Sequence, residues 1–126
     1  MLDQIKDSGR FVVDVAQNSE YYFYEITLTE NKNYYTPWLN LQGKARVAYE
    51  YYNFYTSPGG VTVYIEVSPF SDGSSNITRL ATTVNAASTS SGDIVIPAQF
   101  MRFRVASGSN TGNYTVRIWV AVHPVS

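Results

Sequence analysis

The sequence predicts an all-β protein, an antiparallel β-sandwich of eight to nine strands with no significant helix. Two observations support this fold class. Apolar and polar residues alternate with a period of two along several stretches, as they do in strands that bury one face. Clusters of Gly, Pro, Asn and Ser separate these stretches at short intervals, which is typical of sandwiches and small barrels. A small barrel is the alternative architecture.

The chain is expected to form one domain behind a short arm. Its 126 residues suffice to bury roughly two-thirds of the surface that the unfolded chain exposes. Residues 1–9 are mostly polar and end in glycine, so they predict an N-terminal arm whose only apolar anchors are Leu2 and Ile5. Residues 10–126 then form a single β-sandwich domain, without an internal repeat.

The first part of the domain is expected to contain strands at residues 10–15 and 22–29, separated by a turn. In the second of them the even-numbered residues from Tyr22 to Leu28 share the apolar face. Pro37 confines the piece that follows to an edge strand or a loop. We expect Trp38, beside it, to fill the core in preference to forming a binding platform.

Residues 44–55 and 61–68 alternate clearly and are expected to pair as a hairpin, because the SPGG sequence at 57–60 is a strong turn signal. A loop at 69–76 and a short strand at 77–83 follow. The small and polar residues at 85–93 indicate a mobile connection.

The stretch 94–122 is expected to organise the fold as a second, longer hairpin. Two alternating runs flank the turn-forming sequence SGSNTGN, and closing the hairpin at residues 109–110 places Phe103 opposite Val116. One core is then shared by the apolar residues of this hairpin and of strand 61–68: Met101, Phe103, Val105, Val116, Ile118, Val120, Val61, Val63, Ile65 and Val67.

The outward face of this hairpin is the candidate functional surface. In the expected register Arg102 lies opposite Arg117, and like charges directly across an antiparallel pair are unfavourable. Either the outward carboxylates Glu50 and Glu66 neutralise the arginines, or the face is a contact surface, since Arg and Trp dominate interface energetics. The interface candidates are Phe100, Arg102, Arg104, Arg117 and Trp119 on this face, Phe23, Tyr52 and Tyr64 on other strands, and Leu2 and Ile5 in the arm.

Composition narrows the classes of partner. Nine basic residues against ten acidic ones give a net charge of −1, which lacks the basic excess of nucleic-acid-binding proteins. No stretch approaches the roughly eighteen apolar residues of a membrane span, and the start lacks the layout of a signal peptide. Eleven tyrosines exceed what a small core needs, so exposed aromatic side chains indicate protein or carbohydrate partners.

The residues needed for catalysis or for a metal site are not found together. The chain has no cysteine, and its single histidine, His123, lies near the end of the sequence with no carboxylate or serine at a suggestive spacing. Asp72 is better explained by a turn than by a calcium loop, which needs further acidic ligands. We therefore expect no catalytic residue, no metal and no cofactor.

Two partial resemblances add to this interpretation. The segment with Ser71-Asp72-Gly73, the run FMRFRV at 100–105 and the final strand is similar to the second half of discoidin-like, galactose-binding jelly rolls. That resemblance covers about half of the chain, and it implies a jelly-roll-like sandwich that binds carbohydrate.

The whole chain also looks like the small, cysteine-free, Tyr- and Thr-rich β-sandwich proteins of phage particles, especially capsid decoration or cement proteins. This second resemblance rests on size, the polar arm and the lack of a catalytic set. It implies a non-enzymatic virion protein, made in the host cytoplasm, that forms a homo-oligomer, often a trimer, on a larger protein shell. Secretion and a carbohydrate-binding module remain the alternatives.

Overall fold

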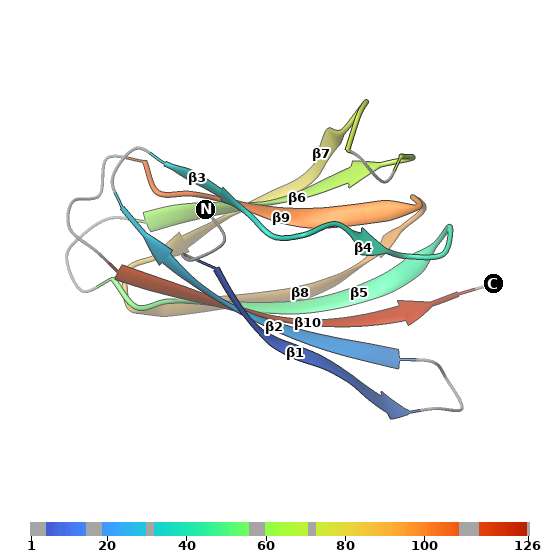
Figure 1. Cartoon of the computed structure of the whole chain (residues 1–126). Coiled ribbons are helices and arrows are strands. Elements are labelled where there is room, and N and C mark those ends of the chain that lie inside the picture. The colour runs from blue at the N-terminus through green and yellow to red at the C-terminus, as the bar shows by residue number, and fades with distance from the viewer. Residues whose placement is uncertain are drawn as a thin grey trace.

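The computed structural model describes residues 5–14, 19–29, 32–55, 60–70, 73–108 and 114–125, and for residues 5–14 it describes the backbone alone. Within these ranges the chain forms ten strands in two five-stranded antiparallel sheets, which pack face to face (Figure 1). The same ranges contain no helix, and hence none that could span a membrane. The predicted all-β sandwich is confirmed.

Sheet A has the strand order β1–β2–β10–β5–β8. Its strands are β1 (Ile5–Asp14), β2 (Ser19–Leu28), β10 (Tyr114–Pro124), β5 (Ala45–Asn53) and β8 (Ser88–Ile96). Sheet B has the order β3–β9–β6–β7, with β4 also paired to β9. Its strands are β3 (Asn33–Tyr35), β4 (Leu39–Asn40), β9 (Phe100–Ala106), β6 (Gly60–Ser68) and β7 (Ile77–Asn85).

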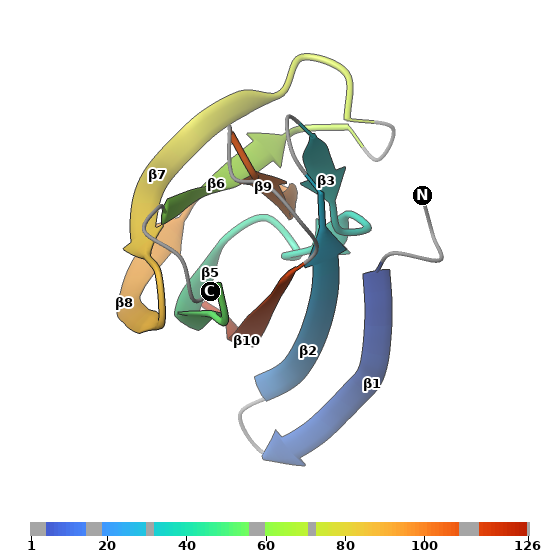
Figure 2. The ribbon, with the colours of Figure 1, turned by 90° about the vertical axis from the view of Figure 1, so that its left-hand side faces the viewer.

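The connections give the sandwich the topology of a jelly roll. Only β1–β2 and β6–β7 are consecutive strands that pair within one sheet, and β3 and β4 follow one another along the same edge of sheet B. Every other connection crosses from one sheet to the other, as the view along the sandwich shows (Figure 2). This interleaving of strands between two sheets is the jelly-roll arrangement.

Both predicted long hairpins are wrong. β9 belongs to sheet B and β10 to sheet A, and β5 and β6 are divided between the sheets in the same way. The alternation of apolar residues is equally satisfied by two strands in one sheet and by two strands that face each other across a core. Phe103 and Val116 therefore share the core as predicted, but they belong to opposite sheets.

Two further segments differ from expectation. The stretch 85–93 is not only a connection, because β8 begins at Ser88 after a turn in which Ala87 adopts a positive φ of 54°. Residues 5–9, expected in the arm, are part of β1, where Ile5 pairs with Ile26. Leu2 lies outside the described residues.

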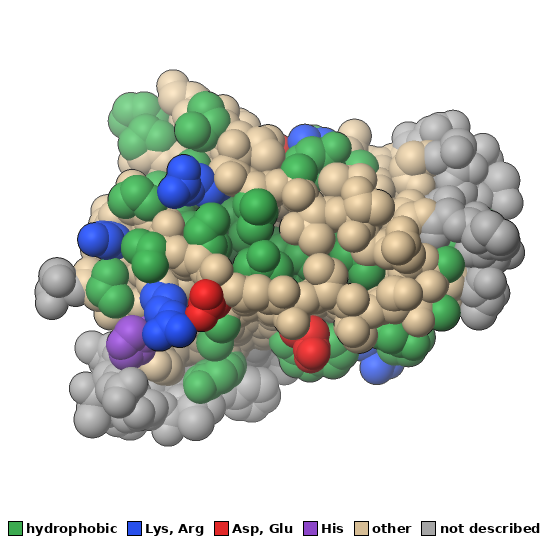
Figure 3. Space-filling view, turned by 180° about the vertical axis from the view of Figure 1, so that it is seen from behind, with side chains coloured by type: hydrophobic (Ala, Val, Ile, Leu, Met, Phe, Trp, Pro, Cys, Tyr) green, Lys and Arg blue, Asp and Glu red, His purple; other side chains and the backbone are tan. Residues whose placement is uncertain are grey.

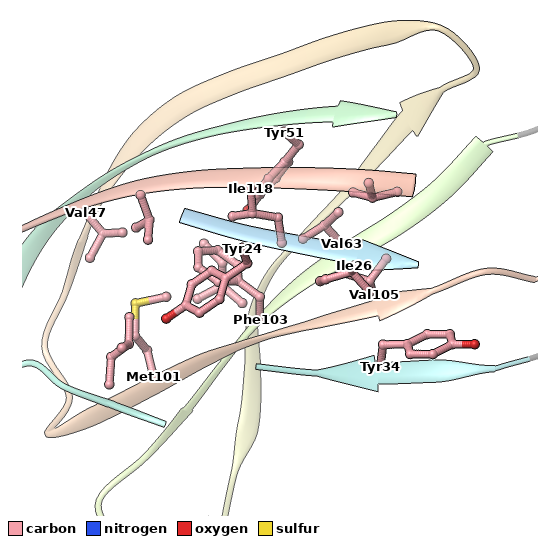
Figure 4. Packing of buried hydrophobic residues seen from close by; sticks show 14 of the residues in the cluster. Tyr24, Ile26, Tyr34, Val47, Tyr51, Val63, Met101, Phe103, Val105 and Ile118 are labelled. Atoms are coloured by element: carbon pink, nitrogen blue, oxygen red, sulfur yellow. The ribbon is translucent and has the colours of Figure 1, made fainter. Parts of the chain in front are cut away.

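The core between the sheets contains the apolar set that the alternation predicted. All ten residues named above are buried, from 0% to 7% exposed. Phe103 occupies the middle, where its ring meets those of Tyr24 and Tyr51 edge-on at centroid distances of 6.4 and 5.9 Å (Figure 4). The interpretation of Trp38 as a core residue is wrong, because Trp38 is only half-buried and is not part of this cluster.

Candidate functional site

The candidate residues lie on two opposite surfaces and not on one. Since β9 and β10 are in different sheets, their outward side chains point away from each other. The outer face of sheet B has Phe100, Arg102, Arg104 and Tyr64. The outer face of sheet A has Arg117, Trp119, Phe23 and Tyr52. Ile5 is known only by its backbone, and Leu2 lies outside the described ranges.

Arg102 and Arg104 of sheet B share one acidic partner within the subunit. Arg102 donates from Nε to Glu66 Oε1 at 2.8 Å, and Arg104 donates from Nε to Glu66 Oε2 at 2.7 Å. Glu66 is 5% exposed, so one nearly buried carboxylate accepts from both guanidinium groups. Close charge-assisted bonds of this kind offset the desolvation of all three side chains. The intramolecular hypothesis is therefore correct for Glu66.

Aromatic rings cover the same two arginines. The Arg102 guanidinium carbon lies 4.3 Å from the ring centroid of Tyr35 and 4.4 Å from that of Trp38. Arg104 lies 3.7 Å from the ring centroid of Tyr64. Such cation–π contacts contribute about 0.5–2 kcal/mol each. Arg102 and Arg104 thus have both an acidic and an aromatic partner within the subunit.

The sequence did not reveal Tyr35 and Trp38 as partners of Arg102. They belong to the edge of sheet B, on either side of Pro37, where the strand pattern is too short to place them. The sequence showed an outward-facing Arg102 and, elsewhere, the aromatic residues Tyr35 and Trp38, but nothing in it indicated that they meet.

Arg117, the candidate arginine of sheet A, has a different acidic partner from the one expected. Arg117 donates from Nε to Glu25 Oε2 at 2.9 Å, and its guanidinium lies 4.7 Å from the ring centroid of Phe54. Glu50 does not contact it, because the register of β10 and β5 places Glu50 opposite Trp119. The predicted role of Glu50 as a counter-ion for arginine is wrong.

A shallow, mainly apolar groove of about 610 Å³ runs across the outer face of sheet A. Phe23 and Trp119 are directly opposite on β2 and β10 and form one wall, with ring centroids 5.1 Å apart. Ala48 and Ala121 pair with each other beside them, and their small side chains leave the hollow. Tyr21 and Trp119 remain 39% and 38% exposed.

Glu50 stands on the rim of this groove, and its carboxylate has no hydrogen bond or ion pair within the described part of the chain. A groove with aromatic walls and one available acceptor can bind an apolar or aromatic group that also offers a hydrogen-bond donor. The outward alanines at Ala48 and Ala121 were the sequence signal for a hollow, and the pattern of large residues alone did not show it.

Among the described residues, the side chain of His123 has a serine as its partner. His123 shares a hydrogen bond of 2.8 Å between its Nδ1 and Ser19 Oγ. Over the described ranges, no group of three His, Cys, Asp or Glu side chains is placed to hold a metal ion.

Comparison with known proteins identifies the fold. No family model and no curated protein matches the chain. Among solved structures, the PBSX exported protein XepA superposes with a TM-score of 0.67 at 17% identity over 81% of this chain, which spans only 36% of that protein. A Bacillus endospore appendage protein, from appendages described as disulfide-linked pili, superposes with a TM-score of 0.58 at 12% identity, covering 85% of this chain and 88% of the other. At these identities the likeness establishes the shared fold.

Proposed function

We propose that this chain is a non-enzymatic structural protein, a component of a virion or a comparable extracellular particle, which associates with identical subunits and with a larger protein shell. The groove of Phe23 and Trp119 on sheet A supports the proposal most directly. Its lining includes the exposed rings of Tyr21 and Trp119.

The contrast between the two outer faces supports this choice. On sheet B, exposed aromatic rings already stack on arginines that a buried carboxylate holds in place. On sheet A, Trp119 and Tyr21 flank an open hollow. Aromatic side chains are enriched at interface centres, where desolvation of a tryptophan makes a large contribution to binding.

The fold is compatible with such a role. The endospore appendage protein shares the sandwich over most of both chains, and its appendages are pili. This chain has no cysteine, so its subunits would have to associate through surface contacts and not through disulfides. Capsid decoration is the specific form of the proposal that the sequence resemblance favours.

Carbohydrate binding by the same groove is the second candidate. Glu50 favours it, because a carboxylate beside an exposed tryptophan can accept hydrogen bonds from the hydroxyl groups of a sugar ring stacked on the indole.

The test is the replacement of Trp119 by alanine, with Tyr35→Ala as the matched control. Both rings are exposed to a similar degree, 38% and 43%, but they lie on opposite faces of the sandwich. Trp119→Ala is expected to weaken assembly by about 30- to 1,000-fold, the effect of losing an interface hot spot of about 2–4 kcal/mol. Tyr35→Ala should leave assembly unchanged. Light scattering during size-exclusion chromatography measures the mass of each.

Equal assembly of both variants and the wild type would contradict the proposed role of sheet A. A wild-type protein that stays monomeric, and whose Trp119 fluorescence responds to a panel of oligosaccharides, would favour the carbohydrate-binding module instead.

A further inference from the structure

The four sheet edges of this sandwich are not equally protected. An edge strand presents unpaired backbone N–H and C=O groups, and proteins commonly interrupt such edges to prevent pairing with other chains. β1 has two register shifts, between Asp7 and Arg10 and between Val12 and Asp14. The opposite edge, in sheet B, is made of two short pieces separated by a segment that contains Pro37.

The remaining two edges differ from each other. β7 has a register shift where it pairs with β6, at the position of the exposed Arg79. β8 has none, because each of its nine residues pairs in unbroken register with β5, from Ala45↔Ile96 to Asn53↔Ser88. β8 also contains no proline and no lysine. Of the four edges, β8 is thus the one whose described backbone is regular and available.

Partly exposed apolar side chains lie on and beside the edge strand β8. β7 and β8 are joined by a short turn but belong to different sheets (Figure 2). Viewed from behind, hydrophobic side chains show through the middle of the face formed by these two strands (Figure 3). Leu80 and Ile94 are only half-buried against the core, and Val95 is 45% exposed. The edge therefore combines unpaired backbone with apolar surface that a further strand would cover.

We propose that β8 pairs antiparallel with β8 of a second copy of the chain, with Gly92 on the two-fold axis, so that the two copies of sheet A form one continuous sheet. The contact rests on the proposed self-association but is separate from the groove on the outer face of sheet A.

The sequence of β8 favours β8 of a second copy as the strand that pairs with this edge. Gly92 is the middle residue of Ser88–Ile96, so an axis at Gly92 pairs the strand over its whole length and leaves no side chain at the point of symmetry. Asp93 then lies opposite Ser91 of the second copy. Its Oδ2 accepts from Arg46 Nη2 at 2.7 Å within the subunit, and the carboxylate can also accept a hydrogen bond from the Ser91 hydroxyl. An axis at Asp93 would instead place two carboxylates face to face, which is unfavourable.

The other pair of outward-facing residues is also compatible with a two-fold axis at Gly92. In this register Thr89 lies opposite Val95 of the second copy, and both positions are exposed in the single subunit. Cross-strand pairs of β-branched residues stabilise antiparallel sheets. On the inner face, the half-buried Ile94 is covered by the neighbouring strand.

Cysteine cross-linking tests both the contact and its register, because the chain has no cysteine of its own. The variant Thr89→Cys/Val95→Cys brings two thiols together only between copies, since the positions are about 20 Å apart along one strand. Air oxidation is expected to give a covalent dimer, seen by non-reducing electrophoresis, for more than half of the chains. Each single variant should give less than a tenth of that yield.

The matched control Thr89→Cys/Asp93→Cys distinguishes the register. It links copies only if the axis lies at Ser91, so cross-linking of this variant in place of the other would overturn the proposal. No cross-link in any variant, with circular dichroism showing native folding, would overturn it equally.

The same experiment in a Trp119→Ala background separates the two contacts. Retained cross-linking together with a smaller assembly supports both the β8 contact and the groove. If the groove proposal fails, Trp119→Ala leaves the assembly mass unchanged, whereas failure of the β8 proposal is seen as loss of the cross-link alone.

Discussion

Tyr51 lies in the core, and its hydroxyl has no hydrogen-bond partner within the described residues. Its side chain is fully buried, between the edge of Phe103 and the stacked ring of Tyr49, whose centroid is 4.8 Å away. Burial raises the pKa of Tyr51 well above the ordinary tyrosine value of 10.0, and the nearby charge of Tyr49 raises it further. The folded protein therefore keeps this hydroxyl protonated where the unfolded chain would ionise it.

This raised pKa predicts an alkaline loss of stability. Below about pH 10 the hydroxyl is protonated in both states, so Tyr51 adds no pH dependence there. Above that pH the unfolded chain releases the proton and the folded one does not, so the free energy of unfolding falls, by about 1.4 kcal/mol per pH unit for this group. Urea titrations from pH 8 to 11 would measure the slope.

Tyr51→Phe is the matching variant, and it should remove that part of the slope. Near neutral pH it should raise the free energy of unfolding by about 1 kcal/mol, because a buried hydroxyl without a partner is lost. An unchanged slope above pH 10, or a loss of more than 2 kcal/mol at pH 7, would contradict this account of Tyr51.

The burial of individual residues was predictable from the sequence wherever the alternation of apolar and polar residues determines which side chains face the core. The inward positions of β6, β9 and β10 are buried as predicted, and Glu66 was recognised as a carboxylate available to arginine. Glu25 was not recognised as the partner of Arg117, because that pairing depends on β10 lying beside β2. Ion pairs between strands can be foreseen only when the order of the strands is known.

Among the connecting segments, the loop that follows β6 depends on a glycine packed against a ring. Gly73 has a φ of +77°, and a Cβ at this position would lie 2.5 Å from Cζ2 of Trp38. The loop is also held by Ser68, whose hydroxyl donates to the carbonyl of Ser74 at 2.7 Å. The indole that stacks on Arg102 is thus supported from the side by this loop.

Gly73→Ala tests this support, with Gly108→Ala as the control. Both glycines have positive φ, but nothing lies within 4 Å of a Cβ at Gly108. The backbone strain of about 1 kcal/mol is therefore common to both variants. Gly73→Ala should lose about 1–2 kcal/mol more, since Trp38 has to move. Thermal melts measure the difference, and in a Trp119→Phe background the fluorescence of Trp38 should also shift.

Similar losses in the two glycine variants, with unchanged fluorescence, would show that Trp38 is not held by the loop.

Strand positions were largely predictable, and strand partners were not. Alternation located β5, β6, β9 and β10 and identified their buried faces, because each has a single core-facing side. It did not indicate that the strands flanking the SPGG and SGSNTGN sequences belong to different sheets, since a turn-forming composition is compatible with either arrangement. β8 was missed as a strand because its Gly92 and Asp93 are poor strand formers and its serines give no apolar alternation, so only its pairing with β5 fixes it.

For the whole molecule, the jelly-roll order makes the strands unequal in importance. β1 pairs with β2 alone, at an edge, whereas β10 stands between β2 and β5 in the middle of sheet A. β10 also supplies five buried side chains to the core: Tyr114, Val116, Ile118, Val120 and Val122.

Two truncations follow from this difference. A chain that starts at Ser19, without β1, is expected to keep a cooperative unfolding transition at a lower Tm. A chain that stops at residue 113, without β10, should not fold, because the apolar faces of β2 and β5 lose their shared neighbour. Near-ultraviolet circular dichroism and thermal melts measure both, and a cooperative transition in the second chain would contradict the central role of β10.

The central place of β10 also has a consequence during synthesis. β10 is the last of the ten strands to leave the ribosome, yet β2, which lies beside it, is among the first. At about 5–20 residues per second, β2 waits roughly 5 to 20 s for that neighbour. Throughout this time Tyr24, Ile26 and Leu28 have no completed core to enter. The nascent chain therefore exposes these apolar side chains until β10 has been synthesised, and slower translation between β2 and β10 is expected to increase its aggregation.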